Sequence, residues 1–171
     1  MRRLPILALG LCVAAAPAAT AQNAATVSAD AVVVTVGMTV ATLSGLNFGS
    51  VPKGVASTVA PNQAGAGEWQ ITGSANAFVN ISLTLPTQLT NIQAQPGSTM
   101  PIAFGAAAAL WRRATNNPAG ATAFNPSAGT VGRLGPTANP NMYIWIGGTV
   151  TPAAAAKPGI YQGTIIVSLS Y

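Results

Sequence analysis

Side chains that perform acid–base, nucleophilic or metal chemistry are scarce in this 171-residue sequence. It has no histidine, a single cysteine at Cys12, and two carboxylates, Asp30 and Glu68. General acid–base catalysis relies mainly on histidine or carboxylates, and zinc and calcium sites gather several histidine, cysteine or carboxylate ligands. Lys53 and Lys157 could activate a serine or threonine, but both neighbour proline and have the sequence context of loop tips. We therefore expect a protein that is not an enzyme and holds neither a cofactor nor a metal.

Three tryptophans are the remaining candidates for contact with a small ligand. Trp111 precedes Arg112 and Arg113 in a segment that we expect to be a loop, where an aromatic ring could stack on a sugar. Trp69 and Trp145 lie in alternating, strand-like segments, and this setting favours packing in a core. Carbohydrate binding therefore stays an alternative hypothesis rather than the leading one.

The first 21 residues have the pattern of a secretory signal peptide. Arg2 and Arg3 precede an apolar run over residues 4–16, and small residues at 19–21 form a cleavage motif before Gln22. Cleavage there would remove Cys12 and leave 150 residues, which is the size of one domain at 22–171. We expect secretion to the periplasm, the cell surface or the extracellular space.

The charge and hydropathy of the sequence argue against nucleic-acid binding and against a membrane-spanning segment. The net charge of +5 falls to +3 once Arg2 and Arg3 are removed, and the remaining cations form no stripe. A nucleic-acid binder needs several clustered phosphate contacts, so none is expected here. No apolar run after the signal peptide has the length of a membrane span.

Short alternating segments separated by glycine and proline dominate the mature chain. Strands are expected at 32–40, 43–48, 55–59, 68–72, 77–85, 100–104, 141–146, 149–151 and 164–171. Residues 106–114 are expected to form at most a turn or two of helix, and residues 115–140 a long loop. The fold predicted by this pattern is an all-β, immunoglobulin-like antiparallel β-sandwich in a single domain.

Two segments could offer a strand to a partner. In the N-terminal stretch 22–42, one face of the predicted strand carries Val32, Val34, Val36, Met38 and Val40. These side chains could fill the groove of a neighbouring molecule, or they could belong to an ordinary first strand of the same sandwich. In the closing strand, the face expected to be buried carries Ile165, Val167, Leu169 and Tyr171.

Several motifs resemble those of a known group of proteins. They are Leu46-Asn47-Phe48-Gly49, the segment 69–73, the segment 79–86, Gly147-Gly148-Thr149-Val150 and the closing segment 158–171. In this order they resemble the bacterial secreted family catalogued as domain of unknown function 4402. That family is similar in pattern to spore-coat-U and fimbrial-subunit domains, which are incomplete sandwiches that a neighbour's strand completes. The resemblance implies a pilin-like fold and pairing by strand addition, with another copy or with a periplasmic chaperone at the closing strand.

Two functions follow from these observations. The first is a structural or assembly subunit of the bacterial cell surface, of fimbrial type and joined by strand complementation. The alternative is a monomeric secreted module that binds a carbohydrate or a surface ligand.

Overall fold

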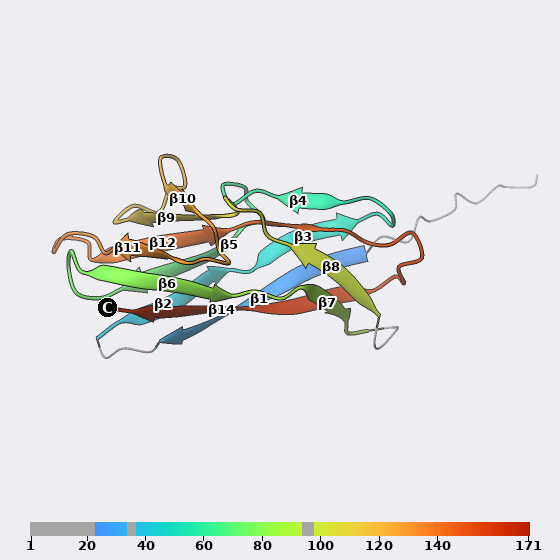
Figure 1. Ribbon diagram of the computed structural model, residues 1–171, viewed down its shortest axis with the longest axis horizontal. Coiled ribbons are helices and arrows are strands. Elements are labelled where there is room, and N and C mark those ends of the chain that lie inside the picture. Colours follow the sequence, from blue (N-terminus) through green and yellow to red (C-terminus); the bar gives the residue numbers. More distant parts are fainter. Residues whose placement is uncertain (1–22, 34–36, 94–97) are drawn as a thin grey trace, which may run out of the picture.

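Strands are the regular elements of this protein (Figure 1). The computed structural model describes residues 23–33, 37–93 and 98–171. The strands are β1 (Asn23–Val33), β2 (Thr39–Ser44), β3 (Leu46–Val51), β4 (Ser57–Val59), β5 (Gly67–Thr72), β6 (Phe78–Thr84), β7 (Gln88–Asn91), β8 (Thr99–Ala103), β9 (Ala109–Arg113), β10 (Thr122–Phe124), β11 (Thr130–Arg133), β12 (Asn141–Ile146), β13 (Gly148–Val150) and β14 (Ile160–Ser170). Within these ranges there is no helix, and hence no helical segment able to cross a bilayer.

The strands form two sheets that pack face to face as a β-sandwich. The nine-stranded sheet has the order β11-β6-β14-β7-β8-β13-β4, with β1 paired to both β14 and β3. The five-stranded sheet has the order β10-β9-β12-β5-β2. Figure 1 shows the long strand β14 and the first strand β1 lying side by side at the base of the molecule. The predicted all-β sandwich is therefore confirmed.

The core lies between the sheets, where alternating side chains meet. Trp69 and Ile71 of β5 are fully buried, and so are Ile165 and Val167 of β14. In β6 the alternation over the predicted strand 77–85 is also present, with its apolar set inward and its polar set exposed. Because successive side chains of a strand point to opposite faces, every second side chain enters the core when one face of the strand packs against it.

Four local predictions are wrong. Residues 32–40 are not one strand, because β1 ends at Val33 and β2 begins at Thr39 in the other sheet. The segment 43–48 belongs to two strands, β2 and β3. The segment 106–114, for which the sequence predicts a helical turn, contains the strand β9. The predicted loop 115–140 contains the strands β10 and β11.

Candidate functional site

The first strand of the described chain occupies an interior position in the larger sheet. β1 runs parallel to β14, with Ala24–Val33 registered against Ile160–Leu169. Its other edge pairs antiparallel with β3, from Asn23 opposite Val51 to Val27 opposite Leu46. We call this position, between β14 and β3, the β1 slot. Because both edges of β1 are paired, the strand closes the sheet where a gap would otherwise lie.

The inward side chains of β1 belong to the core. Ala25 and Val27 have exposed fractions of 0% and 1%, whereas the next residue, Ser28, is exposed. Burial of a valine contributes about 1.5–3 kcal/mol, whereas Ala25 adds little apolar area, so the packing of Val27 and the backbone pairing on two edges together attach β1. The β1 slot therefore recognises a strand through its backbone and through its small inward side chains.

The motif Leu46-Asn47-Phe48-Gly49 shapes the wall of the slot on β3. Leu46 and Phe48 point into the core, with exposed fractions of 1% and 7%. Asn47 accepts a hydrogen bond from the backbone N–H of Gly49 at 2.8 Å, and Gly49 has φ of 63°. At this point the register between β1 and β3 shifts. The motif thus builds a β-bulge, and glycine suits the left-handed conformation that the bulge requires.

The start of β14 is anchored by a buried tyrosine. The hydroxyl of Tyr161, a side chain with no exposed surface, donates to the carbonyl of Lys157 at 2.7 Å. The preceding Gly159 has φ of 148°, and a Cβ at this position would lie 2.5 Å from Nδ2 of Asn91. Asn91 is buried and donates to the carbonyl of Pro158 at 3.3 Å. These contacts fix the turn that leads into the wall of the slot.

The valine-rich candidates of the N-terminal stretch are divided between the two sheets. Val32 lies in β1 opposite Ser168, whereas Val40 lies in β2 opposite Ile71 of the five-stranded sheet. Met38 is buried in the core between these strands, and Val40 packs against the core. Val34 and Val36 lie outside the described residues. The candidates therefore do not share one strand face, and the slot is instead filled by the upstream residues of β1.

The closing strand keeps its predicted alternation. Ile165, Val167 and Leu169 are buried, with exposed fractions of 1% or less. Tyr171 differs, because β14 ends at Ser170 and the ring is 40% exposed. Its hydroxyl accepts from the N–H of Ser74 at 2.8 Å. Tyr171 thus links the chain end to the loop after β5 instead of extending the buried row.

Both edges of β14 are occupied. β1 pairs along one edge, and β6 and β7 pair along the other, with Leu169 opposite Ile81 and Tyr161 opposite Asn91. A partner that added a strand to β14 would therefore have to displace β1 on one edge, or β6 or β7 on the other.

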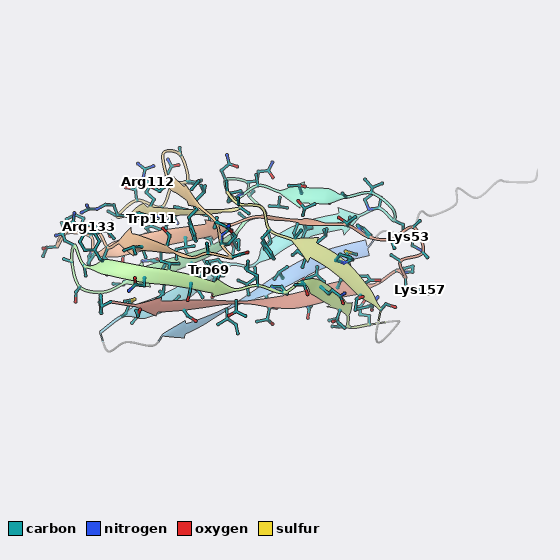
Figure 2. The ribbon with its side chains drawn as sticks, in the orientation of Figure 1. Lys53, Trp69, Trp111, Arg112, Arg133 and Lys157 are labelled. Carbon is teal, nitrogen blue, oxygen red and sulfur yellow. The ribbon has the colours of Figure 1, made fainter. Side chains whose placement is uncertain are left out.

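The tryptophans and basic residues do not form a common binding face (Figure 2). Trp69 is fully buried in β5, and Trp111 lies in β9 against the core instead of in the expected loop. Arg112 donates to the carbonyls of Asn117 and Ala119. Figure 2 shows Lys53 and Lys157 at the other end of the molecule.

The carboxylates also lie apart. Asp30 is in β1 of the larger sheet, and Glu68 is in β5 of the smaller one. Among the residues whose placement the structure describes, no three histidine, cysteine or carboxylate side chains gather as a metal-binding set would.

The upstream half of β1 is the part of the site that the sequence did not reveal. Residues 23–31 read Asn-Ala-Ala-Thr-Val-Ser-Ala-Asp-Ala, in which alanine has low strand propensity. The alternation of Ala25 and Val27 with Thr26 and Ser28 was the available signal.

The chain was compared with models of protein families and with curated proteins. A family model described as Domain of unknown function (DUF4402) matches residues 18–171. The search of curated proteins returned no match.

Proposed function

Because the chain belongs to the family described as Domain of unknown function (DUF4402), and that description states no activity, we propose a function from its own structure. The protein is a secreted, non-enzymatic structural subunit of the bacterial cell surface, of fimbrial type, and copies join by strand complementation. Residues 1–21 act as its signal peptide. The observation that carries this proposal is the occupation of the β1 slot by a strand from the N-terminal end of the chain.

Such a strand is suited to exchange between molecules. Once the signal peptide is removed, β1 continues into the rest of the domain only after Val33. Its attachment consists of backbone pairing to β14 and β3 and of small inward side chains such as Ala25 and Val27. An identical strand from a second copy would offer the same contacts, which is the condition for domain swapping. A periplasmic chaperone could hold β14 by the same kind of strand addition before assembly.

The finer fold assignment also supports this function. The bond from the Tyr161 hydroxyl to the Lys157 carbonyl, at the start of a long strand, resembles the tyrosine corner of immunoglobulin-like sandwiches. We propose that the domain is an immunoglobulin-like, pilin-like sandwich.

One observation favours the alternative, a monomeric binding module. β1 fills the slot within the same chain, so the sandwich has a closed core without a partner. The two functions therefore differ in whether β1 stays in its own molecule or enters another.

A cysteine pair across the slot separates these functions. Ser28 and Thr164 are partners in the register of β1 and β14, and adjacent strands lie about 4.8 Å apart, within the range that a disulfide spans. In a background with Cys12→Ala, the pair Ser28→Cys and Thr164→Cys is oxidised and examined on a denaturing gel without reductant. A covalent ladder that reduction dissolves is the result expected of strand exchange. A monomer band alone, from cells or from concentrated pure protein, would show that β1 never leaves its own molecule.

The matched control is the pair Ser28→Cys and Thr84→Cys. Thr84 lies opposite Ile166 on the far edge of β14, so β14 itself separates it from β1. No ladder is expected from this pair in either arrangement. A ladder that appeared equally in the control would reflect random collision of thiols and would remove the support for exchange.

A further inference from the structure

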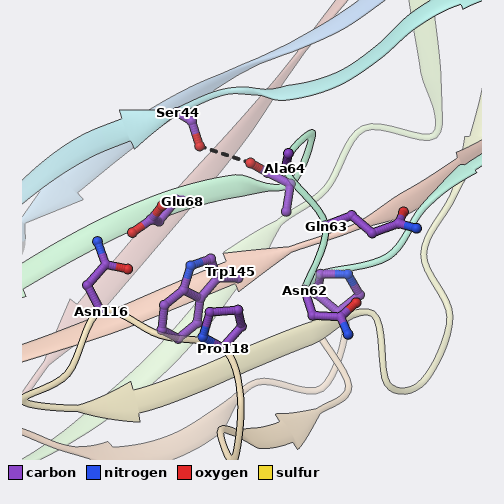
Figure 3. A pocket seen from close by; sticks show the side chains of 10 residues that line it. Ser44, Asn62, Gln63, Ala64, Glu68, Asn116, Pro118 and Trp145 are labelled. Carbon is purple, nitrogen blue, oxygen red and sulfur yellow. Dashed lines mark hydrogen bonds between the residues drawn. The ribbon is translucent and has the colours of Figure 1, made fainter.

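A polar pocket lies at the outer side of the five-stranded sheet, away from the β1 slot. It has a volume of about 220 Å³ and is lined by residues of three strands and two loops, with Ser44 at the end of β2 among them (Figure 3). Glu68 comes from β5 and Trp145 from β12, where the two are register partners. Asn62 and Gln63 belong to the loop between β4 and β5, and Asn116 belongs to the loop between β9 and β10.

The pocket contains a carboxylate without a partner. Oxygen Oε1 of Glu68 is enclosed and receives no hydrogen bond from the described residues. Glu68 is also the one acid whose side chain lies in the described part of the chain. An enclosed carboxylate oxygen without a donor is costly, so the group gains from any donor that reaches it through the pocket.

The arginines of the same half of the molecule are engaged elsewhere. Arg112 donates to backbone carbonyls of its own hairpin loop, and Arg113 donates to Oδ1 of Asn76 at 2.8 Å. Arg133 donates to the carbonyl of Asn76 at 2.9 Å and lies over the Phe78 ring. No ion pair between described residues neutralises Glu68.

We propose that this pocket binds a primary ammonium group on an alkyl stem, with Glu68 as its counter-charge. The ammonium donates to the carboxylate, and its remaining hydrogens meet amide oxygens of the rim, such as those of Asn62 and Asn116. The pocket is smaller than the range of about 300–1,000 Å³ typical of drug-sized ligands, which fits the end of one side chain or a small amine.

Other ligands suit the pocket less well. A divalent cation needs several oxygen ligands, commonly including more than one carboxylate, and Glu68 is the sole carboxylate that lines it. A sugar would need an open aromatic face, and Trp145 is 4% exposed. A compact donor of high charge density therefore matches the site best.

The test is a titration followed by NMR. The indole N–H signal of Trp145, assigned with Trp145→Phe, is recorded while n-butylammonium is added to the full mature protein. Saturable shifts are expected, and the dissociation constant should rise at least about tenfold in Glu68→Gln, because a charge-assisted hydrogen bond is lost. The matched control is Asp30→Asn, which makes the same change in net charge outside the pocket and should bind as the wild type does.

Competing probes of other chemistry complete the design. If n-butanol shifts the signal as strongly as n-butylammonium, or Glu68→Gln binds unchanged, the ammonium site is refuted. Binding of methyl glucoside or calcium in place of n-butylammonium would refute it as well. The melting temperature of Glu68→Gln should be no lower than that of the wild type, since a neutral amide costs less free energy to enclose than a carboxylate. Glu68→Asp serves as the second variant, because it keeps the negative charge but holds it on a side chain one methylene shorter.

The ammonium could come from a free amine or from a lysine of a second copy. Sedimentation velocity with Lys53→Gln and Lys157→Gln separates these sources. Loss of self-association in either variant, together with n-butylammonium binding, assigns the ligand to a neighbour's lysine. Unchanged sedimentation with the same binding assigns it to a free amine.

Discussion

Truncation of Val27 measures how firmly β1 is held in its slot. Val27→Ala removes two carbon atoms from a side chain that is 1% exposed. At about 0.8 kcal/mol for each buried methylene-sized group, the lost transfer energy is about 1.6 kcal/mol. The cavity that remains between the sheets adds to this, and the free energy of unfolding should fall by about 2–3 kcal/mol.

The neighbouring residue provides the control. Ser28 points to the outer face of the same strand and is exposed, so Ser28→Ala should change the free energy of unfolding by less than about 0.5 kcal/mol. Urea denaturation followed by circular dichroism gives both values. For a domain of this size, the melting temperature of Val27→Ala should drop by about 4–12 °C.

Two results would refute this reasoning. Equal, small effects of Val27→Ala and Ser28→Ala would mean that the inward face of β1 does not pack in the core. A larger effect of Ser28→Ala would mean that the strand sits with its faces reversed, as a slip of one residue in register would produce.

Three further substitutions test other contacts. Tyr161→Phe removes the donor to the Lys157 carbonyl and should cost about 0.5–1.5 kcal/mol in urea denaturation; a stability equal to the wild type would show that this bond contributes nothing. Gly159→Ala should cost about 1–3 kcal/mol, because φ is 148° and the new Cβ meets Asn91. Combining it with Asn91→Ala should cost at least about 0.5 kcal/mol less than the sum of the single changes, and strict additivity would contradict the contact. Trp69→Ala should cost about 3–5 kcal/mol, since the ring is fully buried, and a loss below that of Val27→Ala would place the ring outside the core.

Strong alternation was enough to predict the strands that carry the core. β6 (Phe78–Thr84) and β12 (Asn141–Ile146) lie where the pattern placed them, and β14 has its predicted inward face. In these segments the local pattern and the tertiary environment agree, so sequence periodicity is sufficient.

The pattern failed where turns and pairing decide the structure. The valine-rich stretch 32–40 reads as one strand, but β1 ends at Val33 and β2 begins at Thr39 in the other sheet, and Gly37 just before β2 has φ of 90°. The alanine-rich segment 106–114 reads as weak helix, yet it contains the strand β9, because β12 and β10 pair with β9 on its two edges. Long-range pairing of this kind has no local signal.

The outer face of β12 shows why the pocket was not predicted. Residues 141–146 form a nearly continuous apolar run, which indicates burial on both faces but does not say what covers the second face. The structure shows that Trp145 lines a pocket together with Pro118 of the loop between β9 and β10. Because that loop carries no periodic pattern, its place beside Glu68 in the pocket follows only from the folded chain.

Occupation of the β1 slot within one molecule determines how any assembly must proceed. β1 belongs to the same chain as its slot, so its effective concentration there is on the order of millimolar. A neighbour's strand offers the same contacts without burying additional surface. Exchange therefore requires β1 to leave its slot, and heat, high protein concentration or a partner that holds β14 would favour this exchange. Whether the disulfide forms before or after assembly should therefore determine the result. Ser28→Cys with Thr164→Cys, oxidised as a monomer, should be unable to assemble, whereas oxidation after assembly should preserve the ladder. Equal ladders from both orders would mean that copies associate through some surface other than the slot.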